Sequence, residues 1–165
     1  MLIKVKHSNK THVEFCSKFS NLFLKEYYLN ILENDIISEQ FKFNDVEIIS
    51  RDIKDKSRIF YLIQDKNEDK QAGYISFYKN QDILYISQIF ILKNHRGKCL
   101  LKDIIEEIKD IALKSSFKTI GISILENKKK IQEIFKGQGF IKKENSAKYI
   151  GDNIYIYEDE FTYTV

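Results

Sequence analysis

Residues 83–115 decide the fold of this chain: from Ile83 to Ser115 they read ILYISQIFILKNHRGKCLLKDIIEEIKDIALKS. The run Ile83–Leu92 is rich in β-branched and aromatic residues and predicts a strand. After a short basic turn, apolar residues recur at helical spacing and predict an amphipathic helix that ends near Ser115 and Ser116. Its apolar positions are Leu101, Ile104, Ile105, Ile108, Ile111 and Ala112. A strand, a turn and a helix in this order predict a crossover to a parallel strand.

The segments before this stretch predict strands and one long helix. Met1–His7 alternates apolar residues with lysines and predicts a first strand. Thr11 and Glu14 have the spacing of a capping box, so we expect a helix to begin there and to fade near Asn34. Residues 34–58 predict irregular structure with some helix. Three sequential antiparallel strands follow, at Ile59–Gln64, Ala72–Tyr78 and Ile83–Leu92.

The segments after it complete a mixed sheet. Thr119–Leu125 predicts a strand, and Lys128–Phe135 predicts a shorter helix closed by Gly137 or Gly139. Two last strands are expected at Phe140–Lys143 and Asn153–Thr164. The sequence holds no internal repeat, linker or low-complexity tract, which indicates one domain over residues 1–165.

Charge and cysteine content exclude several classes of protein. The 27 basic and 24 acidic residues give a net charge of +3 and are mixed along the chain, which argues against a nucleic-acid-binding module. No run of apolar residues is long enough to span a bilayer. Cys16 and Cys99 are far apart and lack metal-ligand spacing, so neither a zinc site nor a disulfide framework is indicated. We expect a cytoplasmic protein that needs no metal and binds neither nucleic acid nor membrane.

A basic turn, Arg96-Gly97-Lys98, stands directly before the helix of the central stretch. Backbone N–H groups at the start of a helix have no internal partners, and with the helix dipole they form an anion site that suits a pyrophosphate. Arg96 offers a planar fork of donors and Lys98 a mobile charge. Taken alone, the same turn is also typical of an ordinary solvated helix start.

Two motifs resemble the GNAT N-acetyltransferase superfamily. Ile89–Leu101 resembles its motif A, in which a strand leads into Arg/Gln-x-x-Gly-x-Gly/Ala and a long helix. Glu126-Asn127, followed by a short helix with Phe135 and by Gly139-Phe140, resembles its second motif. The element order resembles the GNAT fold over essentially the whole chain. The resemblance implies an α/β (α+β) fold with a mixed central sheet of about six to seven strands flanked by about four helices.

The resemblance also implies an activity and a site. The activity is an acyl-CoA-dependent N-acyltransferase that moves an acetyl group from acetyl-CoA to a primary amine, on a small molecule or a protein, by direct attack. The fourth strand would pair with the pantetheine arm, and the thioester would lie where the fourth and fifth strands splay apart, near Ile91 and Ser123. A backbone N–H near Ile91 would hold the oxyanion. The implied cofactor-binding residues are Ile89, Phe90, Ile91, Arg96, Gly97, Lys98, Cys99, Leu100, Leu101, Lys102 and Asn127.

The chain departs from the family pattern at the cofactor motif. The two small positions of motif A fall on Cys99 and Leu101. Leu101 either turns into the core or points at the pyrophosphate, where it would weaken binding. These departures keep an alternative open: a non-catalytic protein of the same fold that binds CoA or a protein partner. In either case we expect a monomer or homodimer.

The catalytic residues are unknown from the sequence. The tyrosine that protonates the CoA thiolate in the family falls on Phe135, which has no hydroxyl. A general base would help to neutralise the amine, yet the family's base position falls near Ser123, which cannot serve. His95, in the basic turn, is expected to face solvent or the phosphates. Candidate acids are Tyr85 and Tyr149, with Tyr155 and Tyr157 as further tyrosines, and candidate bases are Glu26, Glu33 and Glu126. Tyr27 and Tyr28 could line the acceptor pocket.

Overall fold

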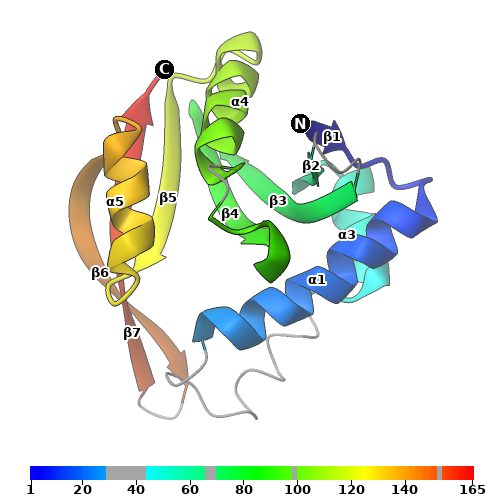
Figure 1. Cartoon of the computed structure of the whole chain (residues 1–165), viewed down its shortest axis with the longest axis horizontal. Helices are drawn as coiled ribbons and strands as arrows, with labels where there is room; N and C mark the ends of the chain where they lie inside the picture. The colour runs from blue at the N-terminus through cyan, green and yellow to red at the C-terminus, as the bar shows by residue number, and fades with distance from the viewer. Residues whose placement is uncertain (29–43, 66–69, 98–99, 152–153) are drawn as a thin grey trace.

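The computed structural model describes residues 1–28, 44–65, 70–97, 100–151 and 154–165, and these form one mixed sheet with helices on both faces (Figure 1). The strands are β1 (Leu2–Lys4), β2 (Ile59–Asp65), β3 (Lys70–Asn80), β4 (Ile83–Ile91), β5 (Thr119–Leu125), β6 (Ile141–Gly151) and β7 (Ile154–Thr164). The helices are α1 (Lys10–Tyr28), α3 (Val46–Lys54), α4 (Leu100–Lys114) and α5 (Lys129–Gly137), with a short 3-10 turn, η2 (Lys93–His95). The predicted fold class is confirmed.

The sheet has the order β1-β2-β3-β4-β5-β7-β6. Every neighbouring pair is antiparallel except β4 and β5, which are parallel and are joined by the crossover helix α4. This confirms the crossover that the central stretch predicts. Where β3 meets β4, a Cβ added at Gly73 would lie 1.9 Å from the backbone oxygen of Phe90, so only glycine permits this approach of the two strands.

Strands β4 and β5 separate after a short paired segment. They pair only from Ile83 to Ile86 on β4, opposite Thr119 to Ile122 on β5. A bulge at this point leaves Ser87 without a partner on β3, because Ile86 pairs with Phe77 and Gln88 with Ser76. Beyond the bulge, β4 continues beside β3 and β5 continues beside β7. The sheet therefore opens into a gap between its two halves.

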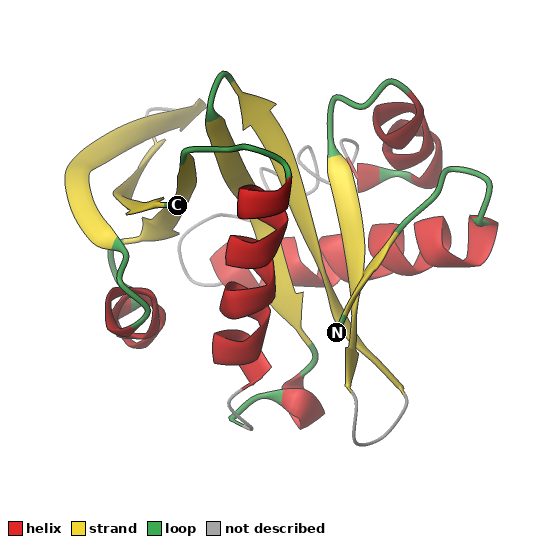
Figure 2. Cartoon of the chain, turned by 90° about the horizontal axis from the view of Figure 1, so that it is seen from above, coloured by secondary structure: helices red, strands yellow, loops and turns green. Residues whose placement is uncertain are grey.

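Two apolar cores lie on opposite faces of the sheet, and Figure 2 shows the strands between α4 and α1. One core packs α4 and α5 against the sheet, with Ile104, Ile108 and Phe135 fully buried or nearly so. The other packs α1 and α3 against β2, β3 and β4, with Cys16 and Ile49 at its centre. Because side chains alternate across a strand, one strand can supply both cores.

Two local predictions need correction, and one is confirmed. Helix α1 begins at Lys10 and not at Thr11: the Asn9 side chain accepts a hydrogen bond from the His12 N–H at 3.1 Å and is the N-cap. Strand β6 runs to Gly151, well past the predicted end at Lys143. The helix expected within residues 34–58 is present as α3, while residues 34–43 lie outside the described residues.

In the part of the chain that the structure describes, no helix combines the length and the apolar character needed to cross a membrane.

Candidate active site

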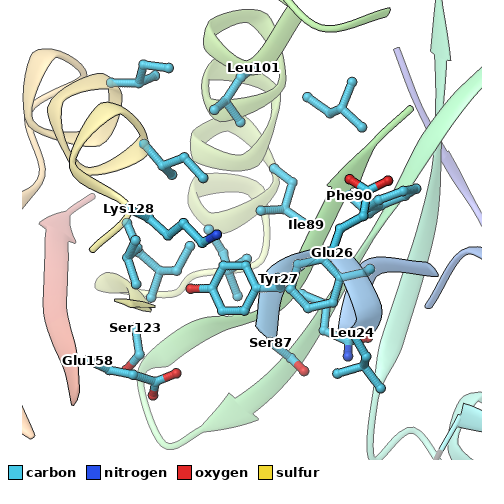
Figure 3. A pocket seen from close by; sticks show the side chains of 18 of the residues that line it. Leu24, Glu26, Tyr27, Ser87, Ile89, Phe90, Leu101, Ser123, Lys128 and Glu158 are labelled. Carbon is cyan, nitrogen blue, oxygen red and sulfur yellow. The ribbon is translucent and has the colours of Figure 1, made fainter. Parts of the chain in front are cut away.

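A cavity of about 930 Å³ occupies the gap between β4 and β5 (Figure 3). Its wall is formed by α1, β4, β5, α4, α5 and β7, so it reaches both faces of the sheet. On the α4 side it is lined by Ile89, Ile91, Leu101 and Ile131, whose side chains also pack against the core beneath α4. On the α1 side it is lined by aromatic and polar groups, among them Tyr27, Tyr85, Ser123 and Glu158.

Most of the predicted cofactor-binding residues line this one cavity. Lys98 and Cys99 lie outside the described residues. Asn127 lies elsewhere, at a smaller hollow of about 370 Å³ beside Tyr155 and Tyr157. The residues that line the cavity are Ile89, Phe90, Ile91, Arg96, Gly97, Leu100, Leu101 and Lys102. Their role in binding CoA remains a prediction.

The edge of β4 presents backbone groups to the cavity. The Leu92 N–H donates to the Ala72 oxygen on the β3 side at 2.8 Å. Because neighbouring residues of a strand direct their backbone groups to opposite sides, those of Ile91 and Ile89 face the gap. The Ile91 oxygen accepts a hydrogen bond from Arg96 Nε at 2.7 Å, which confirms this direction. An extended ligand can pair with such an edge.

The basic turn after β4 is fixed by several contacts. Arg96 donates to Glu26 of α1 at 2.7 Å, and Lys93 lies 3.7 Å from the same carboxylate. The Arg96 guanidinium also lies 5.5 Å from the centre of the Phe90 ring. Gly97 has φ of +81° with open space where a Cβ would stand, so the backbone conformation and not crowding favours glycine there.

His95 does not face solvent as one of the sequence expectations had it. Its side chain is buried, and Nδ1 lies 2.9 Å from the Asp65 carboxylate, which is buried as well at the end of β2. The ring also borders the cavity. No local pattern in the sequence indicates this pair, because Asp65 and His95 are distant in the chain. The pair anchors η2 to the end of β2.

The Leu101 side chain contacts both the core and the cavity, the two positions that the sequence left open. It is half-buried and packs against the core beneath α4, and it also forms part of the cavity wall (Figure 3). It therefore narrows the cavity near the start of α4 without filling it.

The position expected for the acid tyrosine lies in the core. Phe135 is fully buried, with its ring edge-on to Phe140 at 5.0 Å between centres, and it is not part of the cavity wall. Its neighbours Ile131 and Ile134 line the cavity instead.

Of the two candidate acids, only Tyr85 lies at the cavity. Its ring covers Gly121, where an added Cβ would stand 2.7 Å from a ring carbon, and its hydroxyl hydrogen-bonds to the Ser123 hydroxyl. Burial raises the pKa of Tyr85, which keeps the phenol protonated at neutral pH. Tyr149 is exposed on β6 and packs against Tyr155, away from this cavity.

Tyr27 spans the gap from α1 to β5. Its hydroxyl accepts a hydrogen bond from the Leu125 N–H at 2.9 Å, and Figure 3 shows the side chain reaching across the cavity. Lys128 Nζ lies 5.7 Å from the ring centre. Burial raises the pKa of Tyr27. The hydroxyl proton of Tyr27 is thus left free to donate toward the cavity.

Glu158 of β7 is the acidic residue that sequence reasoning missed. It pairs with Leu125 in the sheet and shares the cavity wall with Ser123. Burial raises its pKa above the ordinary value of 4.5, and Lys148 partly offsets that rise. Of the bases named from the sequence, Glu26 is held by Arg96 and Lys93, Glu126 borders the smaller hollow, and Glu33 lies outside the described residues.

Comparison with known families identifies the class of protein. Residues 18–140 match the family described as Acetyltransferase (GNAT) family. The chain therefore belongs to this family, which confirms the resemblance and the prediction of an N-acetyltransferase that uses acetyl-CoA. No curated protein matches the chain in a sequence search.

Solved structures share the fold at low sequence identity. A chimera of spermidine N-acetyltransferase SpeG from Vibrio cholerae and hSSAT has a TM-score of 0.74 at 14% identity, covering 99% of this chain and 95% of that one. Spermidine N-acetyltransferase from Vibrio cholerae in complex with CoA and spermine has a TM-score of 0.70 at 12% identity, covering 99% and 94%. A dodecameric structure of the Vibrio cholerae enzyme has a TM-score of 0.71 at 14% identity, covering 99% and 92%. These similarities show the fold.

Proposed function

We propose that the two substrates of this N-acetyltransferase meet in the gap between β4 and β5, with acetyl-CoA on the α4 side and the acceptor amine on the α1 side. One observation carries the proposal: the cavity reaches both faces of the sheet at the place where the parallel pairing of β4 and β5 ends. Its two sides differ in chemistry, because one has a basic turn and the other has hydroxyl groups and a carboxylate.

On the cofactor side, the proposed contacts follow the exposed edge of β4. The backbone of Ile89 and Ile91 would pair with the amides of the pantetheine arm. Arg96 and Lys102 would approach the pyrophosphate at the start of α4, where helix N–H groups favour anions. Since Arg96 now donates to the Ile91 oxygen, we expect its side chain to release that oxygen when the pantetheine arm binds.

At the thioester, the neutral amine attacks the carbonyl carbon and forms the C–N bond. The tetrahedral intermediate then breaks its C–S bond, and the CoA sulfur gains a proton. A backbone N–H of the β4 edge would hold the oxyanion. Tyr85 is our proposed proton donor to the sulfur, because its hydroxyl is protonated at neutral pH and is fixed by Ser123. The phenol recovers its proton from the ammonium nitrogen of the collapsing intermediate through solvent.

The acceptor is a primary amine on a small molecule or a protein. Spermine is bound by one structural relative, and spermidine gives several of them their names, so we propose polyamines as the first acceptors to test. We further propose a reducing cytoplasm as the place of action, since Cys16 is a free and buried thiol, and a monomer or homodimer as the working form.

The test is a CoA-thiol release assay with acetyl-CoA and a panel of spermidine, butylamine and a lysine peptide, alongside calorimetry of acetyl-CoA binding. We expect acetyl-CoA to bind and at least one amine to give turnover above a heat-inactivated control. Binding without turnover for every amine would favour the non-catalytic alternative, and absence of binding at millimolar acetyl-CoA would contradict the proposed cofactor site.

A further inference from the structure

Tyr85, Ser123 and Glu158 come from three strands and lie on one face of the sheet. Gly121, which the Tyr85 ring covers, shares a face of β5 with Ser123 and Leu125, because alternate residues of a strand point the same way. Leu125 pairs directly with Glu158, and paired residues share a face. This is the face that α1 covers, opposite the core beneath α4.

Glu158 differs from the other acidic residue that lines the cavity in the described part of the chain. Glu26 receives two cations, Arg96 and Lys93, and is thereby tied to the cofactor side. Glu158 makes no ion pair with any described residue, and Lys148 acts on it only at longer range. A half-buried carboxylate that borders a cavity and has no cation of its own is suited to receive one from a ligand.

The position of Glu158 relative to the gap fits a role in the reaction. It lies two residue pairs beyond Ser123, which begins the part of β5 that no longer pairs with β4, so its carboxylate stands at the acceptor side of the expected thioester position. Figure 3 shows Glu158 and Ser123 side by side at the cavity wall that Tyr27 faces. Ser123 itself cannot take a proton from an ammonium group at neutral pH.

We propose that Glu158 binds the acceptor as an ammonium ion and serves as its general base. The carboxylate takes one proton from R–NH3⁺, leaving the neutral R–NH2 that attacks the thioester carbon, and the resulting carboxylic acid returns the proton to solvent after each turnover. This inference rests on the proposed function, and it adds a catalytic residue from β7, close to the C-terminal end of the chain.

The environment of Glu158 suits a base for an amine. Its burial raises the pKa above the ordinary value of 4.5, which makes the carboxylate a stronger base than an exposed one. The titratable groups on this side of the cavity are Tyr27 and Tyr28 of α1, Tyr78 of β3, Tyr85 of β4, Lys148 of β6, Glu160 of β7 and Lys128 before α5. Burial raises the pKa of each of these tyrosines, so they stay neutral while Glu158 titrates.

The experiment compares Glu158→Gln with Glu160→Gln. Glu160 lies two residues along the same face of β7 but is not part of the cavity wall, so it controls for the loss of one negative charge. With the best amine of the panel, Glu158→Gln should lower kcat/KM by about 100-fold, the usual contribution of a general base. Glu160→Gln should change it by less than about 3-fold, and acetyl-CoA binding should be unchanged in both variants.

Two further readouts separate a base from a structural role. The rise of wild-type kcat/KM with pH, at a midpoint above 4.5, should be lost in Glu158→Gln, and Glu158→Asp should recover part of the rate. With trifluoroethylamine, which is largely neutral at the assay pH, the defect of Glu158→Gln should shrink to less than about 10-fold because no proton needs removal.

The outcomes are distinguishable from failure of the proposed function. If wild-type protein turns over an amine and Glu158→Gln keeps its rate and pH profile, the inference is wrong while the function stands. The inference is also wrong if Glu158→Gln binds acetyl-CoA normally and loses the same factor in kcat/KM with trifluoroethylamine as with the best amine of the panel. If wild-type protein turns over no amine, the proposed function fails first, and Glu158 has no reaction to serve.

Discussion

The two sides of the cavity differ in how far apart their residues lie in the sequence. The cofactor side is local: the edge of β4, the basic turn and the start of α4 follow one another within Ile89–Lys102, apart from Lys98 and Cys99, which the structure does not describe. The acceptor side is assembled from α1, β4, β5 and β7, which are far apart in the chain. A contiguous motif can be found by its spacing, whereas an assembled wall requires the order of the strands. The comparison predicts that substitutions will separate the two sides.

The largest expected effect on the cofactor side is that of Arg96→Ala. Loss of a charge-assisted contact to a phosphate should weaken acetyl-CoA binding by about 2 kcal/mol, or roughly 30-fold. The acceptor KM should change little. Calorimetry and initial rates measure the two effects, and Lys93→Ala is the matched control because Lys93 contacts the same Glu26 but does not line the cavity. An equal loss in both variants would argue that Arg96 acts only through Glu26.

On the acceptor side, Tyr85→Phe should lower kcat by about 10-fold and leave acetyl-CoA binding unchanged, because a thiolate needs protonation less than a stronger base would. Tyr149→Phe removes a hydroxyl that lies outside the cavity and should leave the rate as it is. Initial rates at saturating acetyl-CoA provide the measurement. A fall with Tyr149→Phe and none with Tyr85→Phe would reverse the assignment of the acid.

Acetyl-CoA binding should also depend on the backbone conformation of the basic turn. Gly97→Ala places a side chain at φ of +81° and should cost about 1 kcal/mol in the turn, which corresponds to roughly 5-fold weaker acetyl-CoA binding. Gly137→Ala, at the end of α5 and also with open space around the added Cβ, has no such conformational demand. If both variants bind acetyl-CoA like wild type, the turn is not under the constraint that its conformation implies.

The smallest effect concerns the pH dependence of stability. Glu158 has a raised pKa in the folded state, so its contribution to stability is full below the ordinary value of 4.5 and is lost as pH rises through the folded pKa. Denaturant unfolding of Glu158→Gln should show a smaller loss of stability over that window than wild type does. Parallel curves for the two proteins would mean that Glu158 is not desolvated in the folded state.

Much of the fold could be predicted because its elements carry strong periodic signals. Helix α4 and strands β2 to β5 fall close to their expected places. Strand β6 was cut short because its described side chains, from Ile141 to Tyr149, are all exposed, so it shows no alternation of apolar and polar residues. The N-cap was placed two residues too late, at Thr11 and not at Asn9, because both are good capping residues.

The candidate site shows the same contrast between residues that are local in the sequence and residues that the fold brings together. Arg96, Gly97 and the β4 edge were named from the motif, and they line the cavity. Glu158 was missed because β7 lies beside β5 in the sheet although α5 and β6 separate them in the chain. Phe135 stands at the position where the family's acid tyrosine was expected, yet its side chain is buried in the core. Pairing between distant strands leaves no local signal in a single sequence.

The most direct test of two substrates meeting from opposite faces is a crystal structure with a bisubstrate analogue in which CoA is joined through an acetyl linker to butylamine. We predict the pyrophosphate at the turn around Arg96, the pantetheine arm along Ile89 and Ile91, and the amine beside Ser123 and Glu158. Both halves of the analogue on the same face of the sheet, or an amine directed away from Glu158, would contradict the account.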